Sequence, residues 1–137
     1  MLTNIGTVKK TEGQIKKHHT QLTDNEKCRL KDKMIGLTLT LSDHAKDKPF
    51  LNLKHIESCV RRFTVIEFNH VFGKNDNRVL IRSKESFIMN DGKFYNVCLV
   101  ISLDKARIIT VYYNLDNDKH ETLDVRRYRN FNILNFI

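Results

Sequence analysis

The stretch FYNVCLVISLDKARIITVYYN, residues 94–114, decides the predicted fold. Its two apolar runs, 94–103 and 107–114, are separated by only three residues. Runs of this length that are rich in β-branched and aromatic side chains are typical of buried strands. A three-residue connection is too short for a crossover, so we expect the two runs to be antiparallel neighbours at the centre of a sheet.

Two more strands are predicted before this pair, at residues 63–72 and 78–87. The turn GKNDN, residues 73–77, follows the first strand. The turn MNDGK, residues 89–93, follows the second and contains the Asp-Gly dipeptide that is common in hairpins. Because every connection is short, we expect the four strands to form an antiparallel meander.

Helices are predicted before the meander. Thr23 or Asp24 can cap a helix that Gly36 ends. Residues 37–42, LTLTLS, alternate apolar and polar side chains, which indicates a strand with one buried face. Residues 51–62 carry an apolar stripe at helical spacing, so a second helix is expected there.

This order of elements predicts one α+β domain over residues 21–137. Its N-terminal helices are expected to pack on one face of a four- to five-stranded antiparallel meander sheet. Residues 1–20 are polar, include the basic cluster KKHH at 16–19, and show no apolar periodicity. We expect them to form a partly flexible basic arm.

The composition favours an acidic partner. The 137 residues carry a formal net charge of +8, with an isoelectric point of about 9.5. A polyanion is the simplest partner for such a surface, and nucleic acid is the most common one. The three cysteines lie far apart and form no CxxC pair, which argues against a disulfide framework and a zinc site.

Several other classes of function lack their sequence signals. The chain has no glycine-rich phosphate loop, GxSxG elbow or HExxH motif, so we expect neither a cofactor nor a metal ion. No apolar run approaches the ~20 residues of a membrane span, and the first residues show no signal-peptide core. We therefore expect a cytoplasmic protein without a membrane partner.

The remaining candidate residues suit metal-free cleavage of RNA. That reaction needs a base for the ribose 2′-OH, an acid for the leaving 5′-oxygen and a cation for the charge on the phosphate. His44 lies where a predicted strand meets a helix, His120 follows the last strand, and Arg82 lies on an earlier one. Thr110 and Tyr112 are two residues apart on one strand and therefore face the same side. The cations expected to bind RNA are Lys46, Lys48, Arg61, Arg62 and Arg107.

The segment LTLTLSDHAKDKPFLNLKHIESCV, residues 37–60, resembles the start of the barnase–EndoU–colicin–RelE (BECR) class of small ribonucleases and toxins, particularly its phage and prophage members. In that class a strand leads to S-x-H, then to a helix and a meander of strands. The later RVLIRS, VCLVIS and RIITVYYN are similar to its consecutive strands, and the resemblance covers about residues 37–124. One departure is KDKPF at 46–50, because many members have an arginine after the histidine on the same helix.

The resemblance implies roles for five residues. His44 matches the histidine of the first helix, Arg82 a basic residue near the scissile phosphate, and Thr110 the polar residue of the final strand. Tyr112 and His120 carry over in the same way. The class implies metal-independent cleavage of RNA, often tRNA or mRNA, and often a neutralising protein partner such as an antitoxin.

Two other functions fit the same sequence. The first is a non-catalytic module on this fold, such as a phage accessory protein that binds nucleic acid or inhibits a host protein. The second is a DNA-binding regulator, although no pair of helices joined by a tight turn is visible. In either case His44 is a helix-capping or surface residue, and Arg82 and Thr110 are ordinary strand residues.

Overall fold

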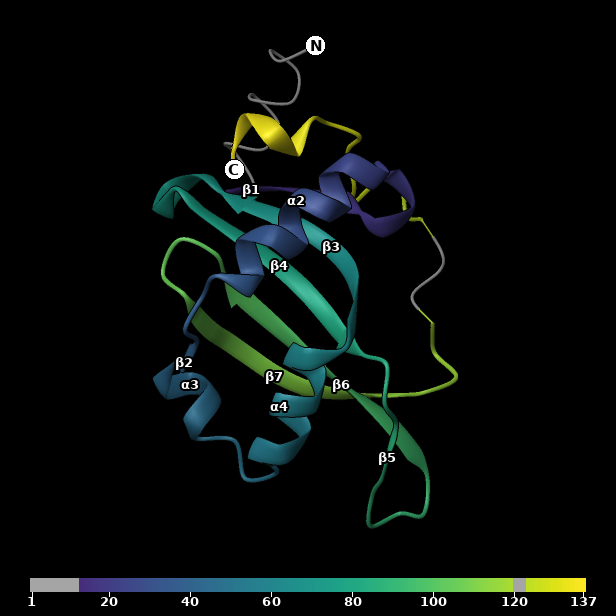
Figure 1. The fold of residues 1–137 in the computed structure, drawn as a ribbon. Helices are drawn as coiled ribbons and strands as arrows, with labels where there is room; N and C mark the ends of the chain where they lie inside the picture. Colours follow the sequence, from purple (N-terminus) through teal and green to yellow (C-terminus); the bar gives the residue numbers. More distant parts are fainter. Residues whose placement is uncertain (1–12, 120–122) are drawn as a thin grey trace.

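The computed structural model describes residues 13–119 and 123–137. Seven strands of this part of the chain form one sheet, with the order β1-β3-β4-β6-β7-β2, and β5 pairs with β6 beside that path (Figure 1). The strands are β1 (Gln14–His18), β2 (Thr40–Leu41), β3 (Phe63–Val71), β4 (Asp76–Ser83), β5 (Phe87–Ile88), β6 (Phe94–Ser102) and β7 (Arg107–Leu115).

The predicted central pair is confirmed. β6 and β7 are antiparallel from Tyr95↔Leu115 to Ser102↔Arg107, and both have sheet neighbours on either side. β3 and β4 extend the antiparallel part of the sheet, as their short connection requires. At the tip of the β5–β6 hairpin, Gly92 has a φ of 78°, a left-handed conformation that glycine adopts without strain.

The α+β class is confirmed, but the four- to five-stranded antiparallel meander is wrong. A strand, β1, precedes the helices and pairs antiparallel with β3 at one edge. At the other edge β2 pairs with β7 in parallel, so the sheet is mixed. The sequence of β1 hides this role because its buried Lys17 and His18 are polar, and their burial depends on partners elsewhere in the chain.

Three α-helices lie between β1 and β3 in the sequence. They are α2 (Asp24–Ile35), α3 (Asp43–Lys46) and α4 (Leu53–Arg61). Thr23 caps α2, since its hydroxyl accepts the Glu26 N–H at 3.1 Å, and Gly36 ends the helix. Asn52 caps α4. Short 3-10 turns occupy η1 (His19–Gln21), η2 (Phe72–Lys74) and η3 (Ile133–Asn135).

The hydrophobic core lies between one face of the sheet and the helices α2 and α4 that cover that face (Figure 1). Alternate residues of the central strands point into it, including Val79, Ile81 and Leu99. The C-terminal segment closes the core, where Phe131 and Ile133 are buried. No described helix is long and apolar enough to cross a membrane.

Candidate nucleic-acid interface

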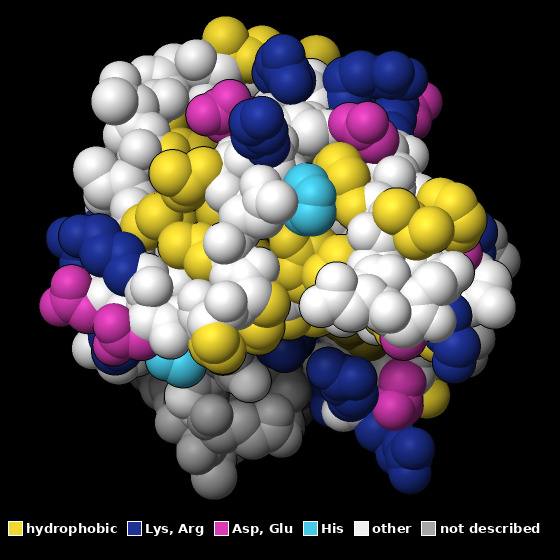
Figure 2. Space-filling view, turned by 90° about the horizontal axis from the view of Figure 1, so that it is seen from below, with side chains coloured by type: hydrophobic (Ala, Val, Ile, Leu, Met, Phe, Trp, Pro, Cys, Tyr) yellow, Lys and Arg dark blue, Asp and Glu magenta, His cyan; other side chains and the backbone are white. Residues whose placement is uncertain are grey.

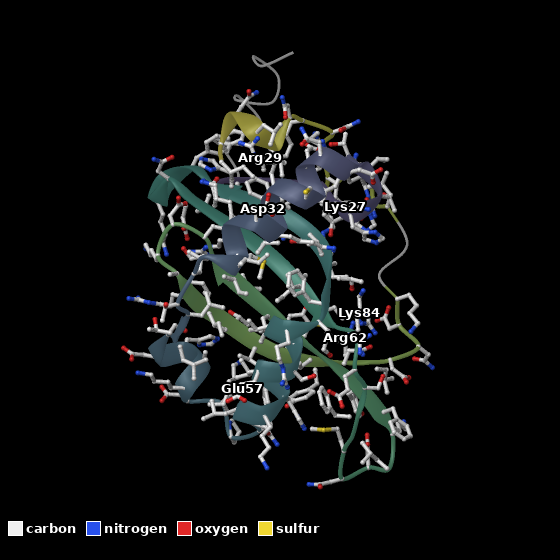
Figure 3. All side chains as sticks on the ribbon, viewed as in Figure 1. Lys27, Arg29, Asp32, Glu57, Arg62 and Lys84 are labelled. Carbon is white, nitrogen blue, oxygen red and sulfur yellow. The ribbon has the colours of Figure 1, made fainter. Side chains whose placement is uncertain are left out.

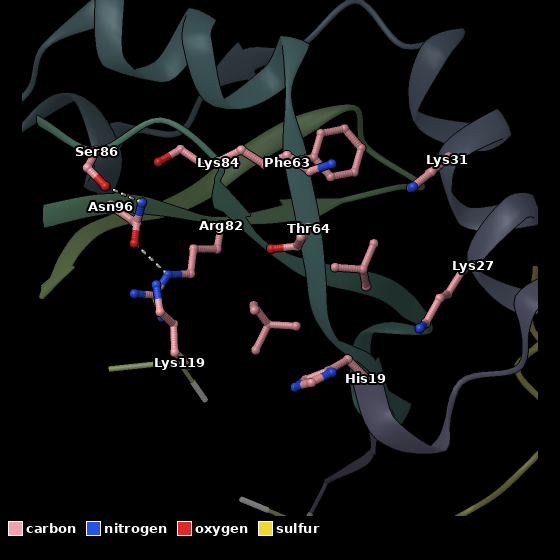
Figure 4. A pocket seen from close by; sticks show the side chains of 13 residues that line it. His19, Lys27, Lys31, Phe63, Thr64, Arg82, Lys84, Ser86, Asn96 and Lys119 are labelled. Atoms are coloured by element: carbon pink, nitrogen blue, oxygen red, sulfur yellow. Dashed lines mark hydrogen bonds between the residues drawn. The ribbon is translucent and has the colours of Figure 1, made fainter. Parts of the chain in front are cut away.

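A basic pocket lies where β1 ends beside β3. β1 pairs with β3 from Gln14↔Val71 to His18↔Glu67, and η1 then turns the chain away. Residues 63–66 therefore have only β4 as a neighbouring strand within the described chain, next to a bulge between Val65 and Glu67. The pocket beside them has a volume of about 560 Å³ (Figure 4). Its charged and titratable lining residues are His19, Lys27, Lys31, Arg82, Lys84 and Lys119.

Helix α2 supplies two of these cations. Lys27 and Lys31 are four residues apart, so they lie on one face of the helix and reach the pocket from the same side (Figure 4). The buried Leu30 and Met34 hold the neighbouring face of α2 against the core. Helix geometry thus fixes where the two ammonium groups can reach.

The end of β4 supplies a third cation. Lys84 directly follows the strand, and its N–H donates to the carbonyl of Arg62 at 3.1 Å. Figure 3 shows the Arg62 and Lys84 side chains side by side at this end of the sheet. The predicted RNA-binding residue Arg62 therefore lies beside the pocket.

Arg82 is buried, with 4% of its surface exposed. Its Nε donates to Asn96 Oδ1 at 2.9 Å and its Nη2 to the carbonyl of Leu115 at 2.8 Å. Its Nη1 also donates to the carbonyl of Asp118. Arg82 thereby fixes the segment after β7 that carries Lys119 into the pocket.

No aspartate or glutamate is among the described residues that line this pocket. A phosphate group entering it would meet several cations and, among the described lining residues, no carboxylate. Charge-assisted hydrogen bonds from lysine or arginine to phosphate are among the stronger hydrogen bonds in proteins. The pocket can therefore hold the backbone of a nucleic acid.

His44 lies elsewhere. It is exposed on the short helix α3, which packs against β7, and it is not among the residues that line the basic pocket. The serine of the S-x-H motif is the helix cap, because Ser42 Oγ accepts the Ala45 N–H at 3.1 Å and donates to the Ile109 carbonyl at 2.8 Å. The structure therefore does not bring His44 to Arg82.

Tyr112 shares a sheet face with Arg82. Cys98 on β6 is the direct cross-strand neighbour of both residues, so the three side chains form one row. Burial raises the pKa of the Tyr112 hydroxyl well above its usual range, and it raises the pKa of Cys98 to about 11. Thr110 is half-buried further along β7, and neither it nor Tyr112 lines the basic pocket. His120 lies outside the described residues.

The other predicted RNA-binding cations are dispersed. Lys46 and Arg61 line an apolar groove beside α4, and Lys46 also lines a small pocket with Arg107 at the β2–β7 edge. The Lys48 ammonium lies 5.9 Å from the centre of the Phe50 ring. None of these four lysines and arginines lines the basic pocket.

Sequence reasoning missed most of the basic pocket. Lys27 and Lys31 had a readable signal, since their four-residue spacing on a predicted helix places both on one face. His19, Lys84 and Lys119 had none, because they meet only through the pairing of β1 with β3 and the turn after β7.

Comparison with known proteins gives no relative: no protein-family model, curated protein or solved structure matches this chain. Among the residues that the structure describes, no group of three or more His, Cys, Asp or Glu side chains could hold a metal ion.

Proposed function

We propose that this protein binds nucleic acid, with RNA as the expected ligand, by contacts between the basic pocket and the phosphate backbone. The observation that supports this most is the set of cations from α2, β4 and the segment after β7 around one pocket. The net charge of +8 adds long-range attraction for a polyanion. Phosphate contacts of this kind provide affinity with little sequence preference.

The test is the salt dependence of binding to a fluorescently labelled single-stranded RNA, measured by anisotropy. Lys27→Gln/Lys31→Gln removes two pocket cations. Lys33→Gln/Lys54→Gln removes two exposed cations that do not line the pocket. We expect the first variant to bind more weakly and to lower the slope of log affinity against log salt by about one per lysine.

The control double variant should change the slope much less. Equal losses in both double variants would show that net charge, and not the pocket, attracts the RNA. Such a result would contradict the proposed site.

A second candidate function is metal-independent RNA cleavage of the BECR type. It is favoured by the position of His19, which lines the pocket together with Lys119 and the buried Arg82. Histidine can act as a general acid or base near neutral pH. A neutralising protein partner belongs to this candidate and stays a prediction.

Incubation of total RNA with the protein in EDTA tests this second candidate. His19→Ala should abolish cleavage if His19 transfers a proton, because one such group contributes about 10²–10⁴-fold to a rate. Loss of cleavage in His44→Ala instead would assign the role to His44. If the wild-type protein binds RNA in a salt-dependent way but does not cleave it, the result would favour the non-catalytic binding module.

A further inference from the structure

An aromatic pocket lies on the underside of the molecule, between the loop after α3 and the β5–β6 hairpin. Its volume is about 470 Å³. Four of its lining residues are aromatic: Phe50, Tyr95, Tyr112 and Tyr113. Figure 2 shows hydrophobic side chains over the middle of this underside, with Lys and Arg side chains toward its margin.

Contacts with neighbouring residues hold the rings in place. The Tyr113 hydroxyl lies 2.6 Å from His55 Nδ1, and the Phe50 ring stands edge-on to Tyr113, with 5.6 Å between the ring centres. The Tyr95 hydroxyl donates to Asp91 Oδ2 at 2.5 Å. Phe50 is still 40% exposed, so a ligand can reach it.

The polar groups of this pocket suit the edge of a base. Asn90 and Asp91 line it, and the Asp91 carboxylate accepts the Lys93 N–H and the Tyr95 hydroxyl through different oxygens. Each carboxylate oxygen has a second lone pair that can accept an amino group of a base. The Lys48 ammonium, 5.9 Å from the Phe50 ring centre, is placed for an adjoining phosphate.

We propose that this aromatic pocket binds an unpaired nucleobase by stacking on Phe50 and Tyr95. The proposal rests on the proposed nucleic-acid binding and makes single-stranded segments the preferred ligand. Aromatic rings stack on any base, and each such contact is worth about 1–3 kcal/mol. An acidic peptide fits the pocket less well because Asp91 would repel it.

Both pockets are lined by residues of the β5–β6 hairpin and of the segment that leads into it. Ser86 and Asn96 line the basic pocket, whereas Met89 and Tyr95 line the aromatic one. Tyr95 and Asn96 are consecutive on β6, so their side chains point to opposite faces. A single strand that passes around this hairpin would place phosphates in the first pocket and a base in the second.

The test uses a short single-stranded RNA that carries 2-aminopurine, whose fluorescence falls when it stacks on a ring. The test variants are Phe50→Leu and Tyr95→Leu. Phe94→Leu is the matched control, because Phe94 precedes Tyr95 on β6, is 51% exposed and does not line the pocket. We expect quenching by the wild type, a loss of affinity of about tenfold in each test variant and little change in the control.

Tyr95→Phe separates stacking from folding. It keeps the ring and loses the hydroxyl, so it should retain the quenching. Equal quenching and affinity in the wild type, Phe50→Leu and Tyr95→Leu would overturn the proposal. An abasic RNA of the same length that binds as tightly as the base-bearing one would also overturn it.

Two further measurements distinguish a free nucleotide from a nucleic-acid strand as the ligand, and separate this proposal from the proposed function. If free nucleoside monophosphates displace the RNA and bind as tightly as the RNA does, the result would support the pocket, with a free nucleotide as its ligand. Binding of the RNA alone would support it with a nucleic-acid strand. Quenching that is lost in Phe50→Leu but unchanged in Lys27→Gln/Lys31→Gln would support the base pocket while contradicting the phosphate site.

Discussion

At the scale of single residues, the buried pair Lys17 and Glu26 shows how this fold holds charge in its interior. Each side chain is 3% exposed, and Lys17 Nζ donates to both carboxylate oxygens of Glu26, at 2.8 and 2.9 Å. Glu26 also accepts the N–H groups of Thr23 and Ile133. We expect Glu26→Gln to lower the free energy of unfolding by about 3–5 kcal/mol, since it leaves the Lys17 charge buried and unpaired.

The same pair gives a pH dependence. Burial raises the pKa of Glu26, but hydrogen bonds from Lys17, Thr23 and Ile133 outweigh burial and hold that pKa below its usual range. A carboxyl group whose pKa is lowered by folding stabilises the fold fully at pH values above its unfolded-state pKa. This stabilisation is lost as the pH falls through the folded-state pKa. Urea denaturation should therefore show that the free energy of unfolding falls more steeply for the wild type than for Glu26→Gln below about pH 4.3, the pKa of an unperturbed glutamate. The exposed Glu57→Gln should follow the wild-type curve.

Residue types were readable from the sequence, but their partners were not. Arg82 was identified as a basic strand residue, yet its guanidinium is buried against Asn96, the carbonyl of the last residue of β7 and one carbonyl after that strand. Lys17 lies in a run that resembles a polar arm, yet only 3% of its surface is exposed. In both cases the partners lie at least nine residues away along the chain, where no local pattern can indicate them.

At the scale of elements, the structure shows which of two residues caps helix α2, since the sequence allowed either Thr23 or Asp24. Thr23 exchanges two hydrogen bonds with Glu26, whereas Asp24 is the first helical residue. Thr23→Ala should lower the free energy of unfolding by about 1 kcal/mol, and Asp24→Ala by a smaller amount through the helix dipole. Chemical denaturation of both variants measures the difference. A larger loss in Asp24→Ala would contradict the assignment of the cap.

The elements that the sequence predicted best are those with strong periodicity or short connections. α2, α4, β6 and β7 all occur close to their expected ranges. β1 was missed because Lys16, Lys17 and His18 do not alternate with apolar residues. β2 was expected to be longer, and nothing local indicated that it would pair in parallel with β7.

At the scale of the whole molecule, the C-terminal segment joins parts that are distant in sequence. The Tyr128 hydroxyl donates to Glu67 on β3, and the Phe131 carbonyl accepts from Lys17 on β1. Ile133 is fully buried in the core. A chain that stops after Arg127 should lose its cooperative thermal transition, because deleting one large core side chain already costs about 2–5 kcal/mol of a marginal total.

A chain that stops after Leu134 is the control for this truncation. It lacks only half-buried or exposed residues, and it should still unfold cooperatively at a somewhat lower temperature. Circular dichroism during heating measures both proteins. A cooperative transition at the wild-type temperature in the shorter chain would show that the segment after Arg127 contributes little.

The incomplete pairing of β3 also bears on how copies of this protein behave in concentrated solution. Residues 63–66 have no second neighbouring strand in the described chain, and such an edge is a template for the strand of another molecule. Lys27, Lys31, Lys84 and Lys119 surround this edge with like charge. The lysines that would attract a polyanion therefore also keep copies apart, and this protection against self-assembly weakens as salt screens their charge.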